Sequence, residues 1–429
     1  MKTLKLTTLF VILAMLMSVA AYAESCAETC AQACTEMGSG DIKVMGESRY
    51  RIQMDGAGPY FYDFDSDTNP TWFSQLRTRV GIKAAVADNM GVFAQFQDSR
   101  FIGAVNDFGI DPVLDMHQGY MWYKPCEKSW LKLGRFEMSL HNERLVGVSN
   151  WSMYGRSFDG AMFGRQFGEN MKATFWATKD YESFNQYTVI DDTDGTDTAG
   201  DDMFYGINFS FLNKGVDVFA MMNKSYGNIF TPGVFYDENY MTFGAYSERT
   251  FAESFDYNAM FAMQTGTVDF GATEVDISGM LLNAEIGYTM GNGFRLAGLV
   301  DYTTGDDGTT NDKWEGFHNL YYTSHSFNGA MDLVNADDLD EGLMDIGLKA
   351  HYPVNDSWSV MGEFHSFATV EEYAADKTAL GTEIDLSGKY VDGGFAWRTG
   401  LSMFSPSEDR VGPNADSQNW LYTQATMSF

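Results

Sequence analysis

The sequence has no apolar stretch long enough to cross a bilayer as a helix, which excludes a helical membrane protein. The apolar run at residues 6–19 is shorter than the roughly 20 residues that a spanning helix needs, and no later run is longer. Lys2 and Lys5 precede this run, and Ala21-Tyr22-Ala23 follows it as a small-x-small cleavage site. This order predicts a cleavable signal peptide over residues 1–23, and therefore export.

Basic residues are scarce: 28 Lys and Arg face 59 Asp and Glu, for a net charge of −31. A nucleic-acid-binding surface needs a basic stripe, so this balance argues against nucleic acid as a partner. Proline is also scarce, with 8 residues, whereas glycine is frequent, with 43, and aromatic residues make up 15%. Such a composition favours long twisted strands with aromatic girdles at the membrane interfaces.

Only four cysteines are present, and three of them lie in the segment 24–40, which we expect to be periplasmic. Cys26, Cys30 and Cys34 are spaced four apart, which would place them on one stripe of a short helix and make mutual disulfides unfavourable. Export favours oxidised thiols. The alternatives are a disulfide that involves Cys126 or a tether to another chain. No histidine lies near enough to complete a metal site, so we expect no metal and no cofactor.

From residue 41 onward, the chain alternates between apolar and polar residues in segments separated by turn signals. In the first segment Ile42, Val44 and Tyr50 share one face, while Arg49 and Arg51 share the other. Period-2 alternation over about ten residues is typical of a transmembrane barrel strand. We expect eighteen strands, at residues 42–54, 73–86, 90–100, 113–124, 130–138, 156–165, 171–179, 203–211, 216–226, 240–251, 257–270, 277–290, 294–302, 343–352, 358–368, 383–391, 395–404 and 420–429.

Short turns alternate with long polar loops, and the last segment ends on Phe429. Sorting of short and long connections to opposite ends is typical of outer-membrane barrels, and closure of the barrel requires the last strand to pair with the first. The sequence therefore predicts an all-β fold: a single closed antiparallel barrel over residues 41–429, in the outer membrane of a Gram-negative bacterium. Its expected partners are outer-membrane lipid, lipopolysaccharide and the barrel assembly machinery that reads a terminal aromatic residue.

Charged residues fall mainly on the strand positions opposite the apolar ones, which predicts a charged lumen. The arginines gather in the first part of the chain, and a cluster of guanidinium groups in a narrow channel favours carboxylates and phosphates. Two interpretations remain open: a wall of mutually neutralising charges, or a selectivity constriction. The candidate pore-lining residues are Arg49, Arg51, Arg77, Arg79, Arg100, Arg135, Glu137, Arg156 and Arg398.

Several motifs resemble the bacterial alginate export family of outer-membrane channels. They are Leu133-Gly134-Arg135-Phe136-Glu137, Asn150-Trp151-Ser152, Gly155-Arg156-Ser157-Phe158-Asp159-Gly160 and the early Arg77-x-Arg79-x-Gly81. The resemblance implies an eighteen-stranded, monomeric barrel with an electropositive conduit for an anionic polysaccharide. It also implies Arg77, Arg79, Arg100, Arg135 and Arg156 as conduit residues, with Asp159 as a partner. Arg156 and Asp159 have opposite parity, so a bulge intervenes or one of them lies above the membrane.

The function expected from these features is passive passage of hydrophilic, anionic solutes. A general diffusion porin is the first alternative. An outer-membrane enzyme is a weaker one, since none of the six histidines lies in a recognised nucleophile motif and no catalytic residue can be named. A structural or adhesive barrel with a sealed lumen is the third.

Overall fold

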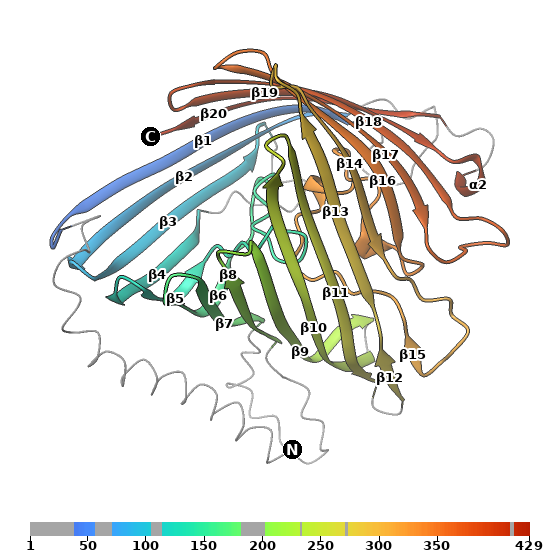
Figure 1. Cartoon of the computed structure of the whole chain (residues 1–429), viewed down its shortest axis with the longest axis horizontal. Helices are drawn as coiled ribbons and strands as arrows, with labels where there is room; N and C mark the ends of the chain where they lie inside the picture. Colours follow the sequence, from blue (N-terminus) through green and yellow to red (C-terminus); the bar gives the residue numbers. More distant parts are fainter. Residues whose placement is uncertain are drawn as a thin grey trace.

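The structure is a computed structural model, and it describes residues 38–55, 71–103, 114–181, 202–231, 234–270, 273–411 and 416–429. Eighteen antiparallel strands form one closed barrel, which confirms the predicted fold class (Figure 1). The predicted signal peptide, Cys26, Cys30 and Cys34 lie outside the described residues. Among the described residues, no helix is long and apolar enough to cross a membrane.

The wall strands follow the chain order around the barrel, from blue to red in Figure 1. They are β1 (Ile42–Asp55), β2 (Thr71–Ala87), β3 (Met90–Phe101), β4 (Asp115–Cys126), β5 (Ser129–Phe136), β6 (Phe158–Phe167), β7 (Met171–Tyr181), β8 (Asp202–Phe211), β9 (Val216–Thr231), β10 (Val234–Phe251), β11 (Phe255–Asp269), β13 (Met280–Thr289), β14 (Arg295–Thr303), β16 (Leu343–Pro353), β17 (Trp358–Thr369), β18 (Ala379–Asp392), β19 (Phe395–Pro406) and β20 (Gln418–Ser428). The short strands β12 (Glu274–Ile277) and β15 (Lys313–Trp314) pair with each other beside β11.

The last strand closes the wall, as its alternation predicts. β20 pairs with β19 on one side and with β1 on the other, in a register that runs from Glu47 opposite Ser428 to Asp55 opposite Trp420. The backbone of Phe429 exchanges two hydrogen bonds of 3.0 Å with Gly46. Closure pairs both edges of the first and last strands. Unpaired backbone N–H and C=O groups at such an edge would be highly unfavourable in lipid.

The outer face of the sheet carries the apolar half of the alternation. Side chains such as Ile82, Phe243, Ile286, Ile346 and Leu386 are exposed there, each by more than 40%. Exposed apolar side chains on successive strands are the expected surface of a barrel in contact with lipid. One segment differs from the prediction: residues 227–239, expected as a loop, belong mostly to β9 and β10, because hairpin pairing continues to Val234 opposite Thr231.

Two long connections at the same end of the barrel fold inward instead of extending away from it. The 137–157 loop joins β5 to β6, and the 315–342 loop joins β15 to β16. Val146 forms a parallel bridge with Tyr321, and the backbone of Tyr321 bonds to Leu145 and Gly147 at 2.8 and 2.9 Å. The two loops therefore pack on each other inside the ring of strands (Figure 1).

The inner face carries apolar clusters as well as the predicted charged residues. Wall residues and residues of the 137–157 loop form one buried apolar cluster, which includes Met138, Leu140, Leu145, Val146, Trp176, Phe204, Phe219, Met260 and Leu281. A second cluster joins Leu333, Val334 and Leu339 of the 315–342 loop to Phe367 and Phe404. Inward apolar residues are stable here because the loops shield them from water.

Candidate functional site

Four arginines of β1 and β2 point into the barrel side by side. Arg49 lies opposite Arg77 in the strand register, and Arg51 and Arg79 occupy the next inward positions along the two strands. All four side chains are buried, and Arg77 has no exposed surface. Successive side chains of a strand point to opposite faces of the sheet. Because Ile52 and Val80 point outward, the neighbouring arginines point inward.

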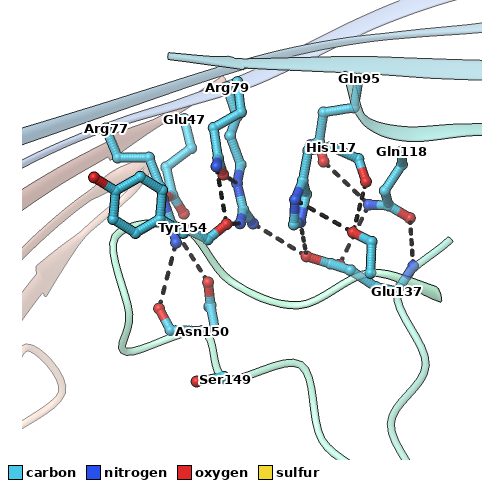
Figure 2. Close-up of polar contacts among 12 residues, drawn as sticks. Glu47, Arg77, Arg79, Gln95, His117, Gln118, Glu137, Ser149, Asn150 and Tyr154 are labelled. Atoms are coloured by element: carbon cyan, nitrogen blue, oxygen red, sulfur yellow. Dashed lines mark hydrogen bonds and ion pairs between the residues drawn. The ribbon is translucent and has the colours of Figure 1, made fainter. Parts of the chain in front are cut away.

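The 137–157 loop supplies the hydrogen-bond acceptors that these arginines need. Each guanidinium donates to a backbone carbonyl of the loop: Arg49 to Asn150 (2.6 Å), Arg51 to Trp151 (2.6 Å), Arg77 to Ser152 (3.0 Å) and Arg79 to Tyr154 (3.2 Å). Figure 2 shows Arg77 and Arg79 reaching down from the strands to this loop. The four arginines therefore hold the loop in place inside the barrel.

Carboxylates compensate only part of this charge. Glu47 lies 2.5 Å from Arg77 and 3.3 Å from Arg49, and Glu137 lies 3.1 Å from Arg79. Arg49, Arg77 and Arg79 thus share two carboxylates, and His117 competes for Glu137 at 2.7 Å (Figure 2). Arg51 donates instead to Gln424 and to the Trp151 carbonyl. The cluster keeps an excess of positive charge in a region largely shielded from water, where electrostatic potentials are strong.

Trp151 joins the arginine cluster to the second loop. The Arg51 guanidinium lies 3.6 Å from the centre of the Trp151 ring, and His325 of the 315–342 loop stacks on that ring at 4.1 Å. Tyr422 of β20 meets the same ring edge-on at 5.0 Å. This contact was missed from the sequence, because Trp151 lies in a segment without alternation and its motif indicated only a family resemblance.

A buried ion pair anchors the other side of the 137–157 loop. Arg144 donates to Asp301 of β14 at 2.9 Å, and both side chains are almost completely buried. Asn283 and Asn328 also donate to Asp301, so its carboxylate is fully engaged. Such a pair is favourable only when hydrogen bonds satisfy the remaining atoms. The loop is therefore fixed to the wall at two places, the arginine cluster and Asp301.

The structure places the other predicted residues in two groups. Arg156 lies in the 137–157 loop, where it donates to the backbone of Tyr321 and Gly147, and Arg398 is half-buried on the inner face of β19. Glu137 follows β5 and lies inside, as described above. These residues and the four clustered arginines are therefore inside the barrel, whereas their selectivity role stays a prediction.

Arg100, Arg135 and Asp159 lie at outward positions of their strands and not at the inward positions predicted for them, so their role in a pore lining stays a prediction. Arg135 shares its face with the exposed Leu133 and forms a bidentate pair with Asp159, with distances of 2.8 and 2.6 Å. Arg100 pairs with Asp98 on the outer face of β3. All three lie near the ends of strands that lead to long loops, where a paired charge meets headgroups or water instead of hydrocarbon.

A cavity of about 620 Å³ lies beside the arginine cluster. It is lined by residues of both faces, including Gln97, His117, Arg135, Arg156 and Asp159. Residues of the inner and outer faces of the barrel both reach this cavity because the sheet ends here: β5 ends at Phe136, and its pairing with β4 ends at Gly119 opposite Arg135. The chain then turns inward as the 137–157 loop.

With this geometry in view, the comparison of sequences assigns the family. The sequence model of the alginate export family matches residues 66–377. The chain belongs to the alginate export family. A search of curated protein sequences finds no match to it.

The structures similar to this alginate export family barrel include proteins of Pseudomonas aeruginosa and Acinetobacter baumannii. The Pseudomonas aeruginosa protein OpdO is 14% identical with a TM-score of 0.62, over 91% of this chain and 97% of that one. OccAB1 of Acinetobacter baumannii is 12% identical with a TM-score of 0.61, over 92% and 98% of the two chains. OccK5 (OpdH) of P. aeruginosa is 14% identical with a TM-score of 0.58, over 92% and 100%. At this identity the likeness shows the fold alone.

Within the family barrel, Ser157, His117 and Glu137 form a chain of polar contacts. His117 Nδ1 lies 3.3 Å from Ser157 Oγ, and Nε2 lies 2.7 Å from Glu137. A serine, a histidine and a glutamate in this order resemble the nucleophile, base and acid of a hydrolase triad. However, Ser157 Oγ donates its proton to the His117 carbonyl at 2.6 Å, so the proton is directed away from the base. These contacts position the loop against β4.

Cys126 is buried at the turn between β4 and β5, and its Sγ lies 3.5 Å from Ser129 Oγ. The proposed disulfide partners of Cys126 lie outside the described residues, so this pairing stays a prediction.

Proposed function

We propose that this chain is an outer-membrane channel that passes hydrophilic, anionic solutes, such as an alginate-like polyuronate or an organic anion, by passive diffusion. The observation that carries the proposal is the cluster of Arg49, Arg51, Arg77 and Arg79, which holds an inward-folded loop. Within the part of the chain that the structure describes, the carboxylates paired with this cluster are Glu47 and Glu137. Membership in the alginate export family supports a channel of this kind.

The inward loops narrow the lumen, so a passing solute comes close to the positive charge of the arginines. They bring Arg156 into the lumen and pack against the wall, so a passing solute meets a narrowed path beside guanidinium groups. A low-dielectric constriction with excess positive charge attracts carboxylates and repels cations. Arginine also binds carboxylates in a bidentate geometry, which suits a uronate repeat.

A general diffusion porin without anion preference is the second candidate, and one observation favours it. Asp345, Glu363, Glu383 and Asp385 lie on the inner face of β16, β17 and β18, so the wall presents both signs of charge. The chain as a whole is also strongly acidic.

Reversal-potential measurement on the purified protein in planar bilayers, with a salt gradient, distinguishes the two candidates. We expect a preference for the anion that decreases in Arg156→Ala and Arg398→Ala. Arg156→Lys keeps the charge and should keep the preference. Arg100→Ala is the matched control, because Arg100 is paired on the outer face and should leave the reversal potential unchanged.

Absence of measurable conductance would contradict the channel itself. Conductance without anion preference would favour the general porin. A loss of preference in both Arg156→Ala and Arg156→Lys would show that this residue acts through loop position instead of charge.

The proposal also includes the setting of the channel. We infer a monomer in the outer membrane of a Gram-negative bacterium, surrounded by lipid and lipopolysaccharide and inserted by the barrel assembly machinery. The exposed apolar outer face and the terminal Phe429 support this placement.

A further inference from the structure

Four carboxylates and one histidine gather on the inner face of three neighbouring strands, away from the arginine cluster. In the register of β17 with β18, Glu363 lies opposite Asp385 and His365 lies opposite Glu383. Asp345 of β16 lies beside His365. Because alternate residues of a strand share a face, two adjacent pairs on β17 and β18 form a compact square of side chains.

The cluster is buried, and several of its polar atoms lack a hydrogen-bond partner. His365, Glu383 and Asp345 have no exposed surface, and Asp385 is 7% exposed. Among the described residues, neither carboxylate oxygen of Asp385 has a hydrogen-bond partner, and one oxygen of Glu383 has none. Buried polar atoms without partners are costly, so they indicate a missing counterpart at this place.

The histidine is oriented for coordination. Nδ1 of His365 lies 2.8 Å from Asp345, which leaves Nε2 directed toward Glu363 at 3.5 Å. The ligand atoms that Glu363, His365 and Asp385 offer all lie within 4.8 Å of one another. A carboxylate that holds Nδ1–H while Nε2 faces other ligands is the usual support of a metal-bound histidine.

Two donors from outside the cluster contact its carboxylates. Lys349 lies 3.5 Å from Glu363, and Met331 of the 315–342 loop donates its backbone N–H to Glu383 at 2.8 Å. From β19, Ser402 is the inward residue opposite Asp385. Among the described residues, the charged groups of the site are thus four carboxylates, Lys349 and His365. Asp301 of β14 lies opposite Asp345 but is paired with Arg144.

We propose that this cluster binds one divalent transition-metal ion of the zinc class, with Nε2 of His365 and the carboxylates of Glu363 and Asp385 as ligands. Glu383 is positioned to supply a further oxygen. Mixed imidazole and carboxylate ligands suit Zn²⁺, which binds both at about 2.0–2.2 Å. The ion would neutralise the acidic part of the wall beneath the 315–342 loop.

Isothermal titration calorimetry with ZnCl₂ tests this site on the full-length, tag-free protein, folded in detergent micelles and stripped of metal with a chelator. We expect one Zn²⁺ per chain with micromolar or tighter affinity. Asp385→Asn and His365→Gln should lower the affinity by more than tenfold. Asp345→Asn, which removes only the orienting carboxylate, should lower it by roughly 10- to 100-fold. The exposed His351 of β16 provides the matched control, and His351→Gln should bind as the wild type does.

Heat-modifiable migration on gels shows whether each variant is folded, so a loss of binding is read only from folded protein. Failure of the wild type to bind Zn²⁺ stoichiometrically in the micromolar range would overturn the proposal. Equal binding by wild type, Asp385→Asn and His365→Gln would also overturn it, since the ion would then lie elsewhere, such as at the N-terminal cysteines. Calorimetry does not depend on conduction, so its outcome is separate from that of the proposed channel function.

Discussion

Arg77 both contributes positive charge to the lumen and holds the 137–157 loop in place. Its guanidinium is fully buried, and it donates to Glu47, to the side chain of Asn150 and to the carbonyl of Ser152. Burial of a charge is unfavourable unless hydrogen bonds and an opposite charge offset it. Because those partners come from a strand and a loop far apart in sequence, Arg77 stabilises the loop inside the barrel.

Arg77→Ala should therefore loosen the 137–157 loop. The substitution leaves Asn150 Oδ1 and the Ser152 carbonyl without this donor and leaves Glu47 paired with Arg49 alone. Each lost hydrogen bond to a charged group costs about 1.5–3 kcal/mol. Hydrogen exchange of folded protein should increase at residues 149–153. The paired outer-face variant Arg100→Ala should leave this exchange unchanged. Equal protection of the loop in Arg77→Ala and wild type would contradict the anchoring role.

His318 predicts a pH dependence in the second loop. Its ring packs on Tyr240, and its backbone exchanges hydrogen bonds of 2.7 and 2.8 Å with Gln264 of β11. Burial lowers the pKa of His318 to about 4, below its usual 6.5. The unfolded state therefore binds the proton more readily between these values, so the local stability is complete above pH 6.5 and falls as the pH decreases toward 4.

NMR of folded protein labelled at histidine checks this prediction. The His318 resonance should titrate near pH 4. The protection factors of residues 315–320, which are exchange rates corrected for the intrinsic pH dependence of amide exchange, should be lower at pH 5 than at pH 7.5. In His318→Asn the difference between the two pH values should disappear. A His318 resonance that titrates near 6.5 would show that the ring is not enclosed as described.

At the scale of elements, the two inward loops and the wall form one packed unit. Trp151 is its centre, because it contacts Arg51 of β1, His325 of the other loop and Tyr422 of β20. Together with the inner face of the barrel the two loops form two apolar clusters, which explains why long polar segments fold inward.

Trp151→Ala should release the contact between the loops and make the channel open more widely or more often. A cation–π contact of this geometry contributes roughly 0.5–2 kcal/mol, so the frequency of loop opening should rise about two- to thirtyfold, since 1.4 kcal/mol is a factor of ten. Single-channel recording measures this change. Trp358→Ala, which removes a partly exposed tryptophan at the start of β17, is the control and should leave gating unchanged. Identical gating in Trp151→Ala and wild type would contradict a central role for this ring.

At the scale of the whole molecule, closure depends on the pairing of the first and last strands. Removal of residues 418–429 deletes β20 and exposes the edges of β1 and β19, whose unpaired backbone groups cannot be satisfied in lipid. We expect this truncated chain to give no heat-modifiable folded band, whereas Ser428→Ala should fold normally. A folded, membrane-inserted truncated chain would contradict the closed eighteen-strand barrel.

Much of the barrel could be predicted from the sequence because period-2 alternation is a local property. The eighteen strands, the short turns and the closing strand at Phe429 all follow from residues that are close in sequence. The inward positions of Arg49, Arg51, Arg77 and Arg79 follow from the same alternation. The alternation argument placed Arg135 on the inner face, whereas it lies at an outward position near the end of β5. A charged side chain is tolerated there because it is paired with Asp159 at the edge of the lipid region.

What the sequence determined by itself was therefore the wall: its strand number, its two faces and the gathering of arginine in its first part. Only the tertiary structure decided what fills the wall, because the contacts that fold the loops inward join distant residues, such as Arg49 with Asn150 and Arg144 with Asp301. Alternation specifies which face a side chain takes, but a loop has no such period. Its path depends on burial and hydrogen bonding, which exist only once the barrel has closed.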